Sequence, residues 1–142
     1  MSEANKAVVR RLLEEVWGKG NLAQVSELMT ADCVCHVASE GVTIIGAEAY
    51  RAHVAARHGI FGDTGVQIAD QVAEGDRVAT RWSTRIEDAE QGPGSAPQMA
   101  IVMAFHRLVD GKIVESWATW DIRETAQLDA EPDALDRLSL NF

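Results

Sequence analysis

The hydrophobic pattern of this chain changes its period partway along, and this change limits the folds that the chain can adopt. Before Gly59 the apolar residues recur at helical spacing, whereas after it apolar and polar residues alternate as in half-buried strands. The alternating segments are residues 65–74, 77–87, 98–108 and 112–122. Tight turns can join these neighbouring strands. Such an order, helices first and then strands connected by tight turns, is typical of an α+β domain with an antiparallel sheet.

Three segments before Gly59 each carry one apolar stripe, so we expect three helices there. The third helix spans about Ala47–His58, and a short strand at residues 32–38 precedes it, followed by a turn near Glu40 and Gly41. A bent sheet with these helices on one side would enclose a pocket. The three stripes are Val9, Leu12, Leu13 and Val16; Leu22, Val25, Leu28 and Met29; and Tyr50, His53, Val54 and Arg57.

The Asp110-Gly111 dipeptide predicts a two-residue hairpin turn of the primed type, which sets the pairing of the last two strands. In that register His106 faces Glu115. Polar and aromatic groups beside small alanines suit the wall of a ligand cavity. A three-residue turn would instead shift the register by one residue and re-pair the faces. The predicted pocket face carries His106, Glu115, Trp117, Thr119 and Asp121, with Ala100 and Ala104 between them.

The opposite face of the same hairpin is too apolar to face water, so we expect a homo-oligomer, a dimer or a tetramer, that buries it. For the strand at 77–87 the pattern leaves open which face points inward. A polar Gly/Pro-rich loop is expected at 88–97, and the weakly helical tail from Glu124 could cover an opening or a neighbouring subunit. The outer residues are Met99, Ile101, Met103, Phe105, Val114, Ala118 and Trp120.

Composition narrows the class of protein further. The 142 residues, 46% hydrophobic and 25% charged, suit one globular domain spanning residues 1–142. A net charge of −9 argues against nucleic acid or an anionic membrane as partner. The sequence has no run of 18 apolar residues, and the charged N-terminus does not resemble a signal peptide, so a cytoplasmic location is expected.

The DCVCH segment could suggest a metal site. In a strand, however, Cys33 and Cys35 point to one face and His36 to the other, so the three side chains cannot converge on one ion. We therefore interpret the cysteines as buried thiols and expect neither a metal nor a cofactor. The sequence shows neither a glycine-rich phosphate loop nor a nucleophile elbow.

Four pieces of the chain, in order, resemble the SnoaL-like polyketide cyclase branch of the NTF2-like superfamily. They are NKAVVRRLLEEVWGKGNLAQVSELMTADCVCH, GAEAYRAHVAA, VAEGDRVATRWS and DGKIVESWATWD. The resemblance covers nearly the whole chain from Asn5 to Asp121, and the order and spacing of the pieces carry it more than any single motif. It implies a cone-shaped α+β barrel, in which helices and a curved antiparallel sheet enclose a pocket.

The resemblance also implies a function and a set of site residues. Family enzymes close a ring of an aromatic polyketide, in antibiotic biosynthesis, by an intramolecular aldol reaction without metal or cofactor. The family's catalytic aspartate corresponds to Asp121, a pocket histidine to His106, and the histidine ending the first strand motif to His36. The chain departs from the family at Cys33 and Cys35, at residues 61–63 and in the loop at 88–97.

Each candidate site residue also has a structural interpretation. Asp121 is either the acid/base catalyst or a turn residue at a strand end. His106 either donates a hydrogen bond to an enolate, or tunes the catalytic carboxylate, or forms a structural pair with Glu115. The candidate substrate-binding residues, any of which could instead pack in the core or wall, are His36, Tyr50, His53, Trp82 and Trp117. As alternatives to a cyclase we expect a non-catalytic binder of a small hydrophobic molecule, an accessory to a hydroxylation step, or a hydratase or epoxide hydrolase.

Overall fold

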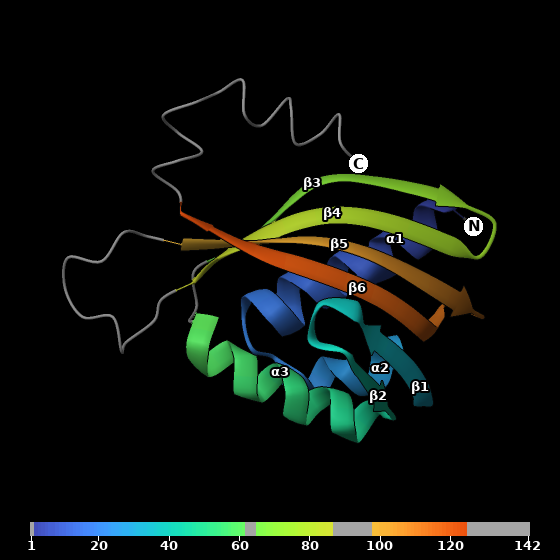
Figure 1. Cartoon of the computed structure of the whole chain (residues 1–142). Helices are drawn as coiled ribbons and strands as arrows, with labels where there is room; N and C mark the ends of the chain where they lie inside the picture. Colours follow the sequence, from blue (N-terminus) through green and yellow to red (C-terminus); the bar gives the residue numbers. More distant parts are fainter. Residues whose placement is uncertain (1, 62–64, 87–97, 125–142) are drawn as a thin grey trace.

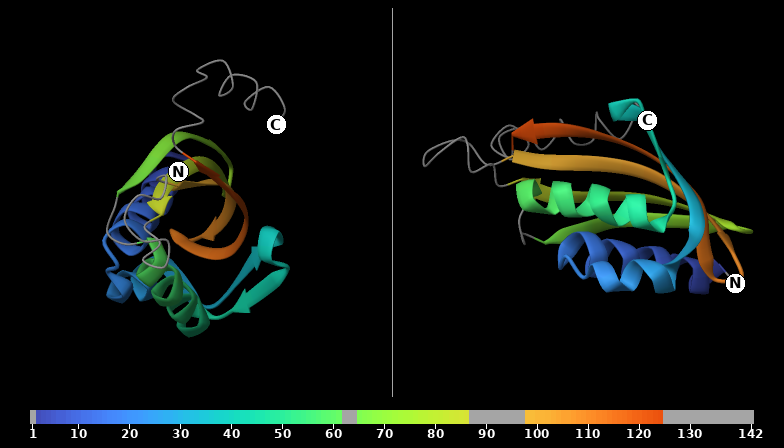
Figure 2. Two further views of the ribbon diagram at one scale, coloured as in Figure 1. Left: turned by 60° about the vertical axis from the view of Figure 1, so that its left-hand side comes forward. Right: turned by 90° about the horizontal axis from the view of Figure 1, so that it is seen from below.

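A computed structural model describes residues 2–61, 65–86 and 98–124 of the chain. Within these residues, helices come first and lie against the concave side of one curved sheet (Figures 1 and 2). The helical elements are α1 (Ser2–Arg11), a π-helical continuation η1 (Leu12–Gly18), the short turns η2 (Leu22–Gln24) and η3 (Ala38–Glu40), α2 (Val25–Leu28) and α3 (Ala47–Phe61). The strands are β1 (Met29–Val37), β2 (Val42–Ile45), β3 (Val66–Glu74), β4 (Arg77–Ile86), β5 (Gln98–Val109) and β6 (Lys112–Glu124).

The six strands form a single sheet in the order β2-β1-β6-β5-β4-β3. The α+β class and all four strands expected after Gly59 are confirmed. The expectation of a wholly antiparallel sheet was wrong in one place, because β1 pairs with β6 in parallel and the sheet is therefore mixed. Strand β2 was not expected, since its four residues follow the predicted turn directly and are too short to show a clear alternation.

The apolar stripe of the first helix forms the centre of the core. Val9, Leu12, Leu13 and Val16 are all buried, and they pack with residues of the sheet's concave side in one cluster. Burying such a side chain contributes roughly 1.5–3 kcal/mol, so this stripe anchors the helices to the sheet. Met29, expected at the end of the second helix, instead begins β1 and is buried there.

The predicted turn between β5 and β6 is confirmed. Asp110 and Gly111 both have positive φ angles, 52° and 78°, as a primed two-residue turn requires. Val109 pairs with Lys112, and Leu108 pairs with Ile113.

The predicted register beyond this turn was wrong, because a β-bulge follows it immediately. Val114 is an extra residue in β6, so Arg107 rather than His106 faces Glu115. One extra residue sends every later side chain of β6 to the opposite face. Ser116, Ala118 and Trp120 consequently lie on the concave side, and the outer side receives Glu115, Trp117, Thr119 and Asp121.

The bulge has a clear electrostatic consequence. It leaves Glu115 partly exposed, where the carboxylate contacts both Arg107 and His36. In the unbulged register Glu115 and Asp121 would both point toward the apolar interior, and burial of uncompensated carboxylates is costly. The same register places the small Ser116 and Ala118 on the inside, which leaves free volume beneath the helices.

The inward face of β4, which the sequence left open, carries Val78, Thr80, Trp82 and Thr84, and all four are buried. The loop predicted at 88–97 and the tail predicted after Glu124 lie outside the described residues. In the part of the chain that the structure covers, each helix is too short or too polar to cross a bilayer.

Candidate functional site

A cavity of about 70 Å³ lies between the concave face of the sheet and the helices η1 and α3. Space remains there because β5 and β6 present small side chains, Ala100, Ala104, Ser116 and Ala118, toward bulky helical residues. The walls are mainly apolar, with a few polar groups among them, which is the usual composition of a small-molecule site. The polar side chains on the wall include Tyr50, His53, Arg57, Thr84, His106 and Ser116.

His106 is a deeply buried ionisable group on the wall of the cavity. Its side chain is 5% exposed, and its Nδ1 atom has no hydrogen-bond partner among the described residues. Burial lowers the pKa of His106 from 6.5 to about 4, so the imidazole is neutral at neutral pH. The structural alternative, a cross-strand pair with Glu115, was wrong because the bulge places Ser116 opposite His106.

Aromatic side chains from η1, α3 and β4 meet at one part of the cavity wall. The indole Nε1 of Trp17 donates a hydrogen bond of 2.8 Å to the hydroxyl of Tyr50. The Trp17 ring also lies edge-on to His53, with centroids 6.1 Å apart, and tilted against Trp82 at 5.9 Å. Burial raises the pKa of Tyr50, which therefore stays protonated. Trp82 is buried, and its Nε1 has no hydrogen-bond partner within the described segments.

Trp17 lines the cavity but was not among the predicted site residues. A signal for it existed, because Trp17 follows Leu13 by four residues and so lies at the edge of the same helical stripe. A tryptophan at such a position is ordinarily a packing residue, and only its contact with Tyr50 and Trp82 identifies it as part of a cavity wall.

The two cysteines are confirmed as buried free thiols. Cys35 lies on the cavity wall, where burial raises the pKa of its thiol to about 12 against the opposing effect of a hydrogen bond with Ser116. Burial likewise raises the pKa of Cys33. Both thiols are therefore protonated at neutral pH, which makes them poor nucleophiles and poor metal ligands. Among the described residues, no three His, Cys, Asp or Glu side chains are grouped so that they could hold a metal.

One end of the cavity is charged. His53 and Arg57, one turn apart on α3, both line the cavity, and Arg57 donates a short hydrogen bond to Oε1 of Glu40 in η3. The other carboxylate oxygen, Oε2, is buried without a hydrogen-bond partner in the described part of the chain and lies 4.0 Å from Nε2 of His53. Burial lowers the pKa of His53. Glu40 was predicted only as part of a turn, and Arg57 only as part of the stripe of the third helix, so neither was a predicted site residue.

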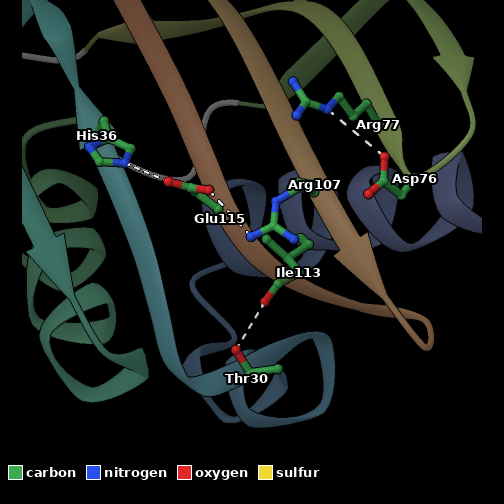
Figure 3. A network of polar contacts seen from close by, with 7 residues as sticks. All are labelled: Thr30, His36, Asp76, Arg77, Arg107, Ile113 and Glu115. Carbon is green, nitrogen blue, oxygen red and sulfur yellow. Dashed lines mark hydrogen bonds and ion pairs between the residues drawn. The ribbon is translucent and has the colours of Figure 1, made fainter.

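His36 belongs to a different network, with Glu115 and Arg107 on the outer side of the sheet (Figure 3). His36 Nε2 lies 2.9 Å from Oε2 of Glu115, and Arg107 donates to Oε1 of Glu115 at 3.3 Å. The hydrogen bond with His36 is the largest cause of a lowered pKa of Glu115, and burial opposes it. Although His36 borders the cavity, its ring stacks on Trp117 with centroids 5.6 Å apart.

Asp121 lies on the outer side of β6, opposite Ile101, and is exposed. Its Oδ1 accepts a hydrogen bond of 2.9 Å from the backbone N–H of Ile122. The expectation that the hairpin brings Asp121 to the pocket face was wrong, because it assumed a hairpin without the bulge at Val114. The structure thus brings His106, Tyr50, His53 and Trp82 around one cavity, but neither Asp121 nor Trp117.

Comparisons with known proteins agree with this architecture. The family model described as SnoaL-like polyketide cyclase matches residues 7–127. IdmH from Streptomyces antibioticus, a candidate polyketide cyclase, is 25% identical with a TM-score of 0.71, over 82% of this chain and 91% of IdmH. AclR from Streptomyces galilaeus, a candidate hydroxylase, is 20% identical with a TM-score of 0.71, over 88% of this chain and 83% of AclR.

A further similar structure is a protein with a ketosteroid isomerase-like fold from Catenulispora acidiphila, in complex with trimethylamine. It is 18% identical with a TM-score of 0.67, over 78% of this chain and 82% of that one. None of the curated proteins compared with the chain matches it. The curved sheet and its helices form the NTF2-like fold that these structures share, and the family model covers most of the sequence. The chain therefore belongs to the SnoaL-like polyketide cyclase family.

Proposed function

We propose that this protein closes a ring in a polyketide-like carbonyl compound by an intramolecular aldol reaction, and that His106 is the catalytic group that binds the reacting carbonyl. The reaction needs a base for a proton next to one carbonyl, stabilisation of the enolate, and protonation of the alkoxide that forms. The observation that carries the proposal is a neutral, buried imidazole on the wall of an apolar cavity, with a nitrogen that has no hydrogen-bond partner among the described residues.

A neutral imidazole suits the stabilising role better than the role of base. With a pKa of about 4, His106 has little tendency to accept a proton at neutral pH, but it can donate a hydrogen bond to a carbonyl oxygen as charge develops there. Such a bond gains strength in an apolar cavity, because competing water is excluded. A second group that lines the cavity must therefore act as the base.

The size of the cavity limits what it can hold. A volume of about 70 Å³ accommodates several waters or the reacting end of a larger molecule, since one water needs roughly 10–15 Å³. We therefore propose that the reacting carbonyls occupy the cavity, where Tyr50, His53 and Trp82 contact them. Catalysis then depends on holding two carbonyl groups of one flexible chain close together.

A simple diketone tests this function. Heptane-2,6-dione closes to 3-methylcyclohex-2-enone by an intramolecular aldol reaction with loss of water, and the enone is followed by its ultraviolet absorbance. We expect the wild type to accelerate closure and His106→Leu to lose about 100-fold or more in kcat/KM, the usual effect of removing one oxyanion donor. The matched control is Asp121→Asn, which should stay within about twofold of the wild type because Asp121 lies outside the cavity. A large loss in Asp121→Asn with little loss in His106→Leu would overturn the assignment.

The second candidate function is binding of a small hydrophobic molecule without turnover, as a carrier or as an accessory to a hydroxylation step. The small, mainly apolar cavity favours it. In that case the diketone would bind, shifting the indole resonances of Trp17 and Trp82, while the wild-type protein would not accelerate ring closure.

We also propose that the protein self-associates through the outer side of the sheet. Phe105 and Val72 are 53% and 68% exposed there, and both line an open groove of about 550 Å³. The corrected register places Trp117 on this groove and moves Ala118 and Trp120 inward, so the surface differs in detail from the predicted one. Exposed apolar side chains around a groove favour an interface over permanent contact with water.

A further inference from the structure

We infer that His53 is the base of the proposed ring closure, and that Glu40, fixed by Arg57, is the positioning residue that orients His53 and balances its charge. This assignment rests on the proposed function and extends it to the proton-transfer step. It uses the charged end of the cavity, where two elements far apart in the sequence meet: η3 supplies Glu40, and α3 supplies His53 and Arg57.

Glu40 is held in a way that leaves one oxygen for His53. The chain turns sharply just after Glu40, where Gly41 adopts a φ of 66° and donates its N–H to the carbonyl of Ala38 at 3.2 Å. This turn points Glu40 toward α3, where the guanidinium of Arg57 binds Oε1. Oε2 is buried and has no hydrogen-bond partner among the described residues, although an unsatisfied buried carboxylate oxygen is unfavourable. Nε2 of His53 lies 4.0 Å from this oxygen.

This geometry selects one form of the imidazole. A carboxylate beside Nε2 favours the tautomer that carries the proton on Nε2, which leaves the lone pair on Nδ1. When Nδ1 takes a proton, the imidazolium lies 4.0 Å from a carboxylate that can compensate its charge. A base oriented by a third, charged group is the general arrangement of activated catalytic histidines.

The surroundings keep His53 ready to accept a proton. Burial lowers its pKa, so the imidazole is neutral at neutral pH, and the ring of Trp17 packs against it in a T-shaped arrangement. His106 is a weaker base because it is more completely buried. The other ionisable groups that line the same cavity are Cys35 and His36 of β1, Tyr50 and Arg57 of α3, and His106 of β5, and Glu40 of η3 lies beside His53.

Nδ1 of His53 takes a proton from the carbon next to one carbonyl, and the electron pair of that C–H bond moves to the carbonyl oxygen, where His106 hydrogen-bonds the enolate. The enolate carbon attacks the second carbonyl of the same molecule, forming the C–C bond and an alkoxide. The imidazolium of His53 returns its proton to the alkoxide, and the neutral base is regenerated.

Nuclear magnetic resonance tests the arrangement without any substrate. In the wild type, nitrogen-correlated spectra of the histidine rings should show His53 mainly as the Nε2–H tautomer. In Glu40→Gln the pKa of His53 should fall by about 0.7 of a unit or more, since the attraction of one charge at about 4 Å is of that size even in water, where screening is greatest. The matched control is Glu48→Gln, the same change in an exposed pair with Arg51 on the same helix, which should leave His53 unchanged. An unchanged tautomer and pKa in Glu40→Gln would overturn the inference.

Kinetics with heptane-2,6-dione separates this inference from the proposed function. His53→Gln should lose about 100-fold or more in kcat, and Glu40→Gln should move the acid limb of kcat/KM to lower pH by the shift seen in the spectra. If His106→Leu is inactive while His53→Gln keeps wild-type turnover, the proposed function stands and His53 is not the base. If the wild type itself does not turn over the diketone, the proposed function fails, and the spectra alone decide whether Glu40 orients His53.

Discussion

Replacing His106 by leucine should stabilise the protein under mildly acidic conditions while it removes activity. In the folded state the pKa of His106 is about 4, against 6.5 ordinarily. The unfolded chain binds this proton at a higher pH than the folded one, so protonation of His106 favours unfolding. The free energy of unfolding is therefore unaffected by the protonation of His106 above pH 6.5 and decreases as the pH falls from 6.5 toward 4. For a pKa lowered this far, the loss is about 2 kcal/mol at pH 5 and about 3 kcal/mol at pH 4.

The leucine variant lacks this titration. Leucine also removes a buried nitrogen that has no hydrogen-bond partner in the described part of the chain, which stabilises by about 1–3 kcal/mol, although imperfect packing can offset about 1 kcal/mol. We therefore expect the variant to be more stable than the wild type by about 1 kcal/mol at pH 7 and by about 3 kcal/mol at pH 5.

Urea denaturation followed by tryptophan fluorescence, at several values between pH 7 and pH 4.5, measures the difference. Other groups also titrate in this range, but they do so in both proteins, so the difference in free energy of unfolding isolates His106. A difference that does not depend on pH would refute the reasoning, because it would mean that His106 titrates alike in the folded and unfolded states. A variant less stable at pH 7 would show that the imidazole has a partner that the leucine loses.

Four further changes test other parts of the structure. Ala100→Leu should fill part of the cavity and weaken diketone binding at least tenfold by calorimetry, with a melting temperature close to that of the wild type; unchanged affinity would place the ligand elsewhere. Trp17→Phe removes the hydrogen bond to Tyr50 and should lower the free energy of unfolding by about 1 kcal/mol in urea denaturation. Glu115→Gln should lower the free energy of unfolding near neutral pH. The difference from the wild type should shrink as the pH falls through the lowered pKa of Glu115, because the wild-type carboxylate then also loses its charge. A difference that stays constant with pH would contradict this. Phe105→Asp should reduce the mass measured by light scattering if the outer groove is an interface, and an unchanged mass would exclude that surface.

The sequence predicted many residues of the candidate site, but not how they contact one another. His106, Tyr50, His53 and Trp82 were predicted as site residues, and each lines the cavity. Glu40 was not found, because an acidic residue beside a glycine is an ordinary turn signal, and its partner Arg57 lies 17 residues away. A contact across that separation has no local signature, so only the packing of η3 against α3 reveals it.

The sequence by itself determined the local structure of this protein. Helical spacing of Val9, Leu12, Leu13 and Val16 dictates a buried helix face, because only one side of that helix can leave water. Alternation after Gly59 dictates strands, and Asp110-Gly111 dictates a primed turn, because both residues tolerate a positive φ. Each of these features depends on neighbours within a few positions, and each is therefore visible in a linear pattern.

Tertiary structure decided which face of β6 meets the cavity. Alternation assigns residues to two sets but does not say which set points inward, and one extra residue at Val114 exchanges them. The bulge is set by partners on other strands: Arg107 on β5 and His36 on β1 hold Glu115 on the outer side. Asp121 moves outward with Glu115, whereas Ser116 moves inward beside His106. The composition of the cavity thus follows from interactions between distant segments, which no pattern along the chain records.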